Sequence, residues 1–390
     1  MSVEVVNLGC RLNLAESERM RGLLAGADNL VVINSCAVTA EAVRQTRQAI
    51  RRARRARPDA RLLVTGCAAE VEREGLAAMP EVDGLVPNAA KLDARSWNVP
   101  AVSAPVVPLH SRGFVAVQNG CDHACTFCVI PQGRGPSRSL PVAQVLREVE
   151  RDLARGAAEI VLTGVDLTSW GHDLPGAPGL GVLVAAVLRE FPRLARLRLS
   201  SLDGVEIDGL LLELLAGEAR VMPHLHLSLQ HGHDLVLKRM KRRHGRADAV
   251  RLVGDLRARR PEIALGADLI AGFPTEDEAM HSANLSIVAE LGIVHGHVFP
   301  YSPRPGTPAA RMPQVSPPLV KARAAELRRE VARVRDLWLR SLIGQELDVL
   351  AERDGTGHAG NFARVALPGN TVSGTIVRVV PQDIEEGLLR

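Results

Sequence analysis

The stretch FVAVQNGCDHACTFCVIP (114–131) joins an apolar segment to three closely spaced cysteines. Cys121, Cys125 and Cys128 follow the spacing C-x3-C-x2-C on the loop after a predicted strand. Three thiolates so close together can ligate three irons of a cubane 4Fe–4S cluster and leave the fourth iron open to another ligand. The alternatives are a structural zinc site, for which His123 offers a fourth ligand, and three buried cysteines.

Strand and helix signals alternate from this stretch to about residue 340. Apolar segments that resemble strands occur six times, and segments with helical periodicity lie between them. The strand segments are FVAVQN (114–119), AEIVLTGV (158–165), RLRLSSL (196–202), HLHLSLQ (224–230), ALGADLIAGFP (264–274) and GHVFPYS (296–302). Parallel strands that are each followed by a helix are the units of the eight-fold barrel, so six units predict a shorter, partial (β/α)6 barrel over 113–340.

The other three cysteines share a position relative to the strands predicted near the N-terminus. Four apolar strand segments alternate there with helical segments, which predicts a small parallel α/β domain over 1–95. Cys10, Cys36 and Cys67 each end a strand segment, in LGC, NSC and TGC. Because ligands gather at the carboxyl ends of parallel strands, we expect these thiols to converge and to bind a second three-cysteine cluster. The alternative is that they are buried apolar residues, as free cysteines often are.

Two further segments complete the predicted organisation. Residues 96–112 are rich in proline and lack helical periodicity, which indicates an interdomain linker. Residues 341–390 alternate apolar and polar positions between glycine and asparagine turns, as in QELDVLAERD and VSGTIVRVV. This pattern predicts a small antiparallel β-barrel. The expected fold class is therefore α/β, with a small all-β domain at the C-terminal end.

The composition is that of a globular protein and restricts the chemistry. The 390 residues are 46% hydrophobic and 24% charged, without an apolar run of the ~18 residues that cross a bilayer. We expect no membrane association and, because MSVEVVNLGC (1–10) lacks a basic-then-apolar signal pattern, a cytoplasmic location. Six cysteines are too few for a disulfide scaffold, and in a reducing compartment they favour metal or redox chemistry.

The basic residues are nearly all arginines, and they form clusters at 44–61, 238–246 and 321–340. The first segment contains a single acid, Asp59, and this excess of positive charge favours a polyanion such as RNA as partner. The alternative is a set of solvated helix faces with acids nearby. Aromatic residues make up only 3% of the chain, so base-stacking positions must be few, and Phe362 in the tail is one candidate.

The three-cysteine α/β domain, the C-x3-C-x2-C barrel with Phe127 before its third cysteine, and the β-barrel tail together resemble the radical S-adenosylmethionine (SAM) methylthiotransferases. The likeness covers essentially the whole chain, and the tail is similar to the RNA-binding TRAM module. The resemblance implies two 4Fe–4S clusters and SAM as cofactors. In this family the barrel cluster cleaves SAM reductively to a 5′-deoxyadenosyl radical, and the N-terminal cluster carries the sulfur that is methylated and delivered. It also implies tRNA and a low-potential electron donor of the flavodoxin or ferredoxin type as partners.

Three motifs distinguish the branches of that family. LGCRLNLAES (8–17) is similar to the form of the threonylcarbamoyladenosine tRNA methylthiotransferases, whereas the isopentenyladenosine enzymes usually show GCQMN and the ribosomal-protein enzymes GCPKN. RGPSRS (134–139) lacks two residues that the isopentenyladenosine branch carries. HLHLSLQHGHDLVLKRMKRRH (224–244) is typical of the threonylcarbamoyl branch, although His231 stands where serine is usual.

The resemblance therefore implies methylthiolation at C2 of N6-threonylcarbamoyladenosine at position 37 of tRNA. The alternatives are methylthiolation of isopentenyladenosine tRNA or of a ribosomal protein. A further alternative, from a different class, is a non-catalytic iron–sulfur protein that binds RNA or senses redox state.

The same resemblance suggests residues that contact SAM, at or near the ends of barrel strands. They are Phe127, Thr163, Gly164, Ser200, Gln230, Ile270 and Gly272. The glycine-glycine-glutamate that is usual at the second strand is not matched by Thr163 and Gly164. Arg134 and Arg138 follow the cysteine loop, and we expect their guanidinium groups to bind the threonyl carboxylate of the substrate.

Overall fold

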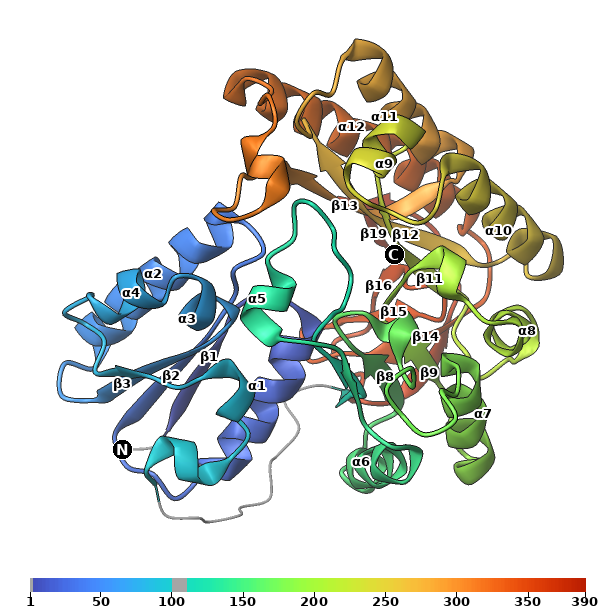
Figure 1. Cartoon of the computed structure of the whole chain (residues 1–390). Helices are drawn as coiled ribbons and strands as arrows, with labels where there is room; N and C mark the ends of the chain where they lie inside the picture. Colours follow the sequence, from blue (N-terminus) through green and yellow to red (C-terminus); the bar gives the residue numbers. More distant parts are fainter. Residues whose placement is uncertain (1–2, 100–110) are drawn as a thin grey trace. The chain divides into compact units, whose positions relative to one another are not determined.

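The computed structural model describes residues 3–99 and 111–390, which form two compact units (Figure 1). The N-terminal unit consists of Met1–Pro108, Asn119–Arg138 and Ser302–Ala310, and the barrel unit of Leu109–Gln118, Ser139–Tyr301 and Arg311–Arg390. The loop with the C-x3-C-x2-C motif therefore belongs to the same unit as the N-terminal cysteines, although in sequence it follows the first strand of the barrel.

Four parallel strands form the sheet of the N-terminal unit, in the order β1-β2-β3-β4. The strands are β1 (Glu4–Asn7), β2 (Leu30–Ser35), β3 (Arg61–Gly66) and β4 (Gly84–Leu85). All six residues of β2 are buried, as is usual for a central parallel strand covered on both faces. The helices of this unit are α1 (Arg11–Leu23), α2 (Ala40–Ala56), α3 (Cys67–Val71), α4 (Arg73–Ala77) and α5 (Ile130–Arg134), with 3-10 turns η1 (Asn88–Ala90) and η2 (Ala94–Trp97). The prediction of a small parallel α/β fold is confirmed.

The barrel unit contains six strand positions whose spatial order follows the sequence. One sheet has the order β5-β8-β9 and a second has the order β10-β11-β12-β13, with parallel pairing throughout. The strands are β5 (Arg112–Ala116), β8 (Glu159–Thr163), β9 (Leu197–Leu199), β10 (Ser201–Leu202), β11 (His224–Gln230), β12 (Ala264–Ala271) and β13 (Ile293–Pro300). Only Ser200 separates β9 from β10, so these two form one interrupted strand. This is the predicted partial (β/α)6 barrel.

Helices follow the barrel strands and bury their apolar faces against them. They are α6 (Val142–Ala154), α7 (Leu180–Glu190), α8 (Gly209–Gly217), α9 (Asp234–Arg239), α10 (Arg246–Arg259), α11 (Glu278–Glu290) and α12 (Pro317–Ser341). In α6, Val145 and Val149 are four positions apart and fully buried, so one helix face packs into the core. Short elements complete the chain: β6 (Gln118–Asn119), β7 (Arg138–Ser139), η3 (Leu167–Ser169), η4 (Gly204–Glu206) and η5 (Pro308–Arg311).

The first strands of the barrel carry a buried charged cluster. Glu159 on β8 accepts hydrogen bonds at 2.8 Å from Nε of Arg198 and at 2.8 Å from Nε of Arg112, and its side chain is completely buried. Burial alone would raise the pKa of Glu159, but the guanidinium groups of Arg198 and Arg112 lower it to about 2. Glu159 is therefore ionised at neutral pH.

The C-terminal segment forms a six-stranded sheet in the order β17-β14-β15-β16-β19-β18. Its strands are β14 (Leu347–Ala351), β15 (Thr356–Ala359), β16 (Arg364–Ala366), β17 (Ile376–Val379), β18 (Ile384–Glu385) and β19 (Leu388–Leu389). The pairs are antiparallel as predicted, except that β16 and β19 are parallel. A separate hydrophobic cluster, which includes Leu339 of α12 and Val349, fills this part of the unit.

The predicted linker falls largely outside the described residues, which omit 100–110. On its N-terminal side η2 ends at Trp97, whose side chain is buried, and on its C-terminal side β5 begins at Arg112. Among the helices of the described residues, none is both long and apolar enough to cross a membrane.

Candidate functional site

The N-terminal cysteines follow the carboxyl ends of three neighbouring strands. Cys10 precedes the first residue of α1, Cys36 follows β2, and Cys67 is the first residue of α3. Ser35 pairs with Gly66 at the ends of β2 and β3, so Cys36 and Cys67 leave the sheet at the same level. This is the edge at which ligands of parallel sheets gather.

The backbone around these thiols is shaped for close approach. Gly9 has a φ of +98°, and a Cβ at this position would lie 2.7 Å from Cβ and 2.9 Å from Sγ of Cys36. A side chain at Gly9 is therefore excluded. Burial, together with the neighbouring thiols of Cys10 and Cys67, raises the pKa of Cys36 to about 11. Three converging soft donors fit an iron–sulfur cluster, which would bind them as thiolates.

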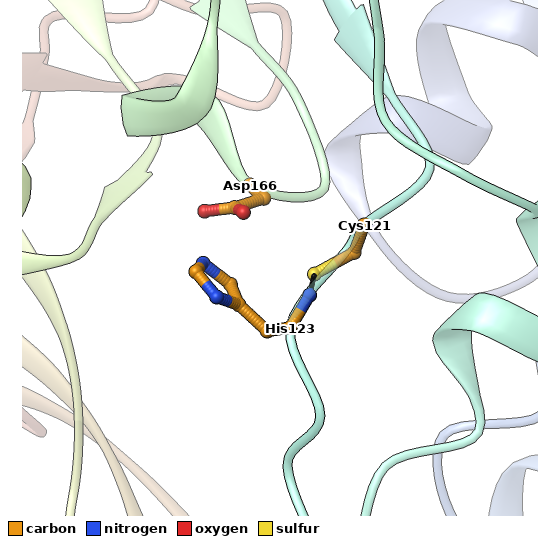
Figure 2. Close-up of side chains that lie close together, drawn as sticks. All are labelled: Cys121, His123 and Asp166. Carbon is orange, nitrogen blue, oxygen red and sulfur yellow. Dashed lines mark hydrogen bonds between the residues drawn. The ribbon is translucent and has the colours of Figure 1, made fainter. Parts of the chain in front are cut away.

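The second set of cysteines lies on the loop between β6 and α5. The backbone N–H of His123 donates to Sγ of Cys121 at 3.4 Å, and the N–H of Ile130 donates to Sγ of Cys128 at 3.4 Å (Figure 2 shows Cys121 and His123). Hydrogen bonds of this kind tune cluster potentials. None of these three cysteines or of the three N-terminal cysteines forms a disulfide bond with the described residues, and Phe127 is half-buried within the loop. The loop thus also offers three thiols for a cluster.

A buried ion network lies beside the N-terminal thiols. The guanidinium of Arg134 donates to both carboxylate oxygens of Glu16, at 2.9 and 3.0 Å, and to Oδ1 of Asn119 at 2.8 Å. Nζ of Lys91 donates to Oε2 of Glu16 at 2.5 Å and to Oδ1 of Asn34 at 3.3 Å. The side chains of Arg134, Glu16 and Lys91 are 1%, 3% and 2% exposed. Burial acts to raise the pKa of Glu16, yet Lys91 and Arg134 hold it below the usual value, so Glu16 is ionised.

Three predicted SAM contacts lie where β8 and β9 end. Thr163 is the last residue of β8 and is buried. A Cβ on Gly164 would lie 2.8 Å from Oε1 of Gln118, so a larger residue there would require the Gln118 side chain to move. The Oγ of Ser200 is buried and has no hydrogen-bond partner among the described residues. Because buried polar atoms are nearly always paired, this hydroxyl fits a site that a polar ligand such as SAM would complete.

The other three contacts predicted on the barrel strands lie where β11 and β12 end. Gln230 ends β11 with a φ of +70°, which is uncommon for a residue other than glycine and recurs at ligand sites. Ile270 lies on β12 and is 7% exposed. Gly272 follows β12, and a Cβ there would lie 2.7 Å from Cγ2 of Val320. Barrel folds bind their ligands at the carboxyl ends of the strands, which is where these residues lie. Their contact with SAM remains a prediction.

Comparisons with known proteins identify the family. The radical SAM superfamily profile matches residues 115–285, and the profile of uncharacterized protein family UPF0004 matches residues 2–87. The threonylcarbamoyladenosine tRNA methylthiotransferase MtaB of Rickettsia prowazekii is 43% identical over 405 residues, which cover 99% of this chain and 96% of that protein. The chain belongs to the radical SAM methylthiotransferase family.

Other methylthiotransferases are similar at lower identity. The tRNA-2-methylthio-N(6)-dimethylallyladenosine synthase of Chloroflexus aurantiacus is 34% identical over 402 residues, which cover 94% of this chain and 84% of that protein. Among solved structures, the radical SAM methyltransferase TsrM of Kitasatospora setae has a TM-score of 0.53 and 17% identity, and the match covers 80% of this chain and 77% of that one. This structural likeness supports the fold alone.

Family membership confirms the predicted cofactors: radical SAM methylthiotransferases use SAM and two 4Fe–4S clusters. The two cysteine triads of this methylthiotransferase fit those clusters, because each offers three thiols without a disulfide bond, on a short loop or at one edge of a sheet. The third cysteine of each set lies at or near a helix start: Cys67 is the first residue of α3, and Cys128 lies two residues before α5.

One substrate contact predicted for this methylthiotransferase needs correction. Arg134 is buried and its guanidinium is held by Glu16, Asn13 and Asn119, so it is not available for a substrate carboxylate. The expectation failed because the partner carboxylate lies 118 positions earlier in the chain. Arg138, by contrast, has an exposed side chain.

The arginine-rich segment of this methylthiotransferase is less positive than its sequence suggests. Acids outside residues 44–61 pair with five of its eight arginines, whereas Arg52 and Arg55 on α2 are exposed and form no ion pair with the described residues. The pairs are Arg44–Glu41, Arg47–Glu72, Arg51–Glu81, Arg54–Asp83 and Arg57–Glu4. An RNA contact at α2 would therefore depend on few residues.

Sequence reasoning missed Glu16, Lys91 and Asn13 as members of the cysteine site. Two signals were present. Asn13 and Glu16 belong to the motif LGCRLNLAES, and Lys91 is one of only four lysines in a chain whose basic residues are otherwise arginines. Neither signal predicts which residues pair with one another, so the contacts among these side chains are known only from the structure.

Proposed function

We propose that this methylthiotransferase adds a methylthio group to C2 of N6-threonylcarbamoyladenosine at position 37 of tRNA. The proposal rests on 43% end-to-end identity with a protein named for that nucleoside, against 34% with one named for dimethylallyladenosine. The motifs LGCRLNLAES (8–17) and RGPSRS (134–139) support the same branch.

The cysteine side chains would hold the two clusters, and other side chains would bind SAM. When bound, the clusters supply reductive cleavage of SAM and the sulfur that is transferred. Cys121, Cys125 and Cys128 would hold the cluster that cleaves SAM. Within the barrel unit, the buried hydroxyl of Ser200 would offer a polar ligand such as SAM a hydrogen bond that no described residue takes up. The N-terminal thiols hold the second cluster at the edge of a rigid sheet, which limits the positions from which sulfur leaves.

Arg138 is the residue that we propose for the threonyl carboxylate. Its side chain is exposed, and one Nη donates to the backbone oxygen of Arg134 at 3.4 Å. A guanidinium has five N–H donors, so this bond leaves a fork for a carboxylate. We expect Arg138→Ala to reduce methylthiolation while uncoupled SAM cleavage continues, and Arg138→Lys to restore part of the product.

Nucleoside analysis of tRNA from a strain lacking this protein tests the proposal. Mass spectrometry should show N6-threonylcarbamoyladenosine accumulating and its 2-methylthio form absent, with 2-methylthio-isopentenyladenosine unchanged. A reintroduced wild-type copy should restore the missing nucleoside, and a copy with the N-terminal cysteines replaced should not. Loss of the isopentenyl product instead would contradict the assignment.

The proposal also extends to partners and location. Reductive SAM cleavage needs a low-potential electron donor, and we propose one of the flavodoxin or ferredoxin type. Since the substrate is tRNA, we place the reaction in the cytoplasm.

A further inference from the structure

A buried excess of positive charge lies in the N-terminal unit. Glu16 is one carboxylate, and it faces two cations, Arg134 and Lys91, all three being at most 3% exposed. An arginine cannot lose its proton in a protein, and Nζ of Lys91 donates to two acceptors. A buried cation without a full counter-charge is costly unless an anion lies nearby. The thiolates of a cluster on Cys10, Cys36 and Cys67 would provide that anion.

Asn13 connects this network to two of the three thiol-bearing loops. Its Oδ1 accepts a hydrogen bond from Nη2 of Arg134 at 2.5 Å. Its Nδ2 donates to the backbone oxygen of Leu8 at 2.7 Å and to that of Ser35 at 3.0 Å. Those oxygens lie two residues before Cys10 and one residue before Cys36. Arg134 therefore orients the amide that holds both loops.

The helix that carries Arg134 also packs against the third thiol-bearing segment. A Cβ on Gly133 would lie 3.2 Å from Cβ of Cys67, so α5 and the start of α3 are in close contact. Nδ2 of Asn88 donates to the backbone oxygen of Gly133 at 2.6 Å. Val129, one residue after Cys128, is buried in the same hydrophobic cluster as Cys67. The segment that follows Cys128 is therefore packed against the segment that begins at Cys67.

We propose that Arg134 is a positioning residue that fixes the loop of Cys121, Cys125 and Cys128 to the N-terminal cysteine site, so that the two clusters are held at one separation. The proposal rests on the cluster assignment of the family and not on the choice of nucleoside. It can therefore fail while the proposed function stands, and the reverse is also true.

The reason for arginine at this position is geometric. The planar guanidinium group of Arg134 donates four hydrogen bonds, to Glu16, Asn13 and Asn119. A lysine would keep the charge but could not hold three partners with a rigid fork. Sulfur transfer between a cluster and a carbon requires close placement, and a misplacement of ~1 Å costs on the order of 10²-fold in rate.

The test uses the reconstituted full-length Arg134→Lys protein, with Arg304→Lys as the matched control. Arg304 is also a buried arginine of the N-terminal unit, with an Nη 3.1 Å from Oε1 of Glu72. Iron content, the magnetic interaction between the two reduced clusters in the electron paramagnetic resonance spectrum, and the ratio of methylthio product to 5′-deoxyadenosine are measured. The first two need no tRNA.

We expect Arg134→Lys to keep both clusters, to change the magnetic interaction, and to lower the product ratio by about 10- to 10²-fold. Arg304→Lys should match wild type in all three. If Arg134→Lys loses its clusters, hydrogen exchange of the protein without clusters decides: faster exchange confined to residues 119–138 supports the proposal, and unchanged or uniformly faster exchange overturns it. An unchanged magnetic interaction and product ratio in a fully loaded Arg134→Lys protein also overturns it.

Discussion

The guanidinium carbon of Arg198 lies 4.7 Å from the centre of the Phe362 ring, and this contact joins strand β9 of the barrel to the turn after β15. The same ring stacks on His358, with centroids 4.5 Å apart, and lies 5.1 Å from the ring of His224. Phe362 is half-buried. The C-terminal sheet is therefore attached to the barrel strands through the residue that the sequence offered as a base-stacking platform.

Replacing Phe362 should affect stability rather than RNA binding. We expect Phe362→Ala to lower the free energy of unfolding by about 2 kcal/mol, less than for a fully buried phenylalanine, because the ring is only half-buried. Urea unfolding measures this change, with Val372→Ala as the control because Val372 is 68% exposed. A variant with unchanged stability and weaker tRNA binding would instead make Phe362 an RNA contact.

The two cysteine sets should separate the two half-reactions. Replacing Cys121, Cys125 and Cys128 by alanine should leave about four of about eight irons and abolish SAM cleavage, because these thiols would hold the cluster that supplies the electron for that cleavage. Iron analysis and chromatography of 5′-deoxyadenosine measure both effects.

The reciprocal variant serves as its control. Replacing Cys10, Cys36 and Cys67 should also leave about half of the iron, but 5′-deoxyadenosine should still form while the methylthio product disappears. Methylthio product at the wild-type rate from this variant would show that sulfur takes another route.

The strand-end cysteines were predictable because a parallel sheet brings consecutive strand ends to one edge, whatever the intervening sequence. The six-unit barrel was predictable because each strand segment is a short apolar run followed by a helical repeat. Both inferences depend on local patterns that repeat, and neither depends on knowing which distant side chains meet.

The role of Arg134 and the effective charge of α2 could not be predicted from local sequence patterns. Arg134 is paired with Glu16, and Arg54 is paired with Asp83, which lies 29 residues further along. Charge counted along the sequence treats such residues as free, whereas the fold supplies acids from other elements. The packing of Phe362 was missed for the same reason, since His224 and Arg198 come from distant strands.

RNA binding should depend on Arg52 and Arg55 more than on their neighbours. Reversing both charges with glutamate should weaken tRNA binding and lower the slope of log affinity against log salt by about 2, because each lost phosphate contact removes about one counterion. Arg44→Gln and Arg54→Gln form the control, because these two arginines already pair with Glu41 and Asp83. Equal losses in the two double variants would mean that α2 has no specific RNA contact.

Acid should weaken the barrel through Glu159. Its folded-state pKa of about 2 lies below the ordinary 4.5, so its contribution is present above pH 4.5 and is lost as the pH falls toward 2. We expect Glu159→Gln to be less stable than wild type by about 3–5 kcal/mol at pH 7, because Arg198 and Arg112 lose their carboxylate.

The difference in the free energy of unfolding between wild type and Glu159→Gln should be measured as a function of pH. It should shrink between pH 4.5 and pH 2 in urea unfolding, since wild-type Glu159 then becomes protonated. A constant difference across this window would mean that the buried carboxylate does not titrate there.

The most direct test is a competition assay in which the purified, reconstituted enzyme is incubated with two tRNAs, SAM and a reductant. One tRNA carries N6-threonylcarbamoyladenosine and the other carries isopentenyladenosine, and nucleoside mass spectrometry follows both. We expect a 2-methylthio product on the threonylcarbamoyl tRNA alone, and we expect it to be lost when Cys10, Cys36 and Cys67 are replaced. A product that forms on the isopentenyladenosine tRNA, with the threonylcarbamoyl tRNA left unmodified, would show that the assigned substrate is wrong.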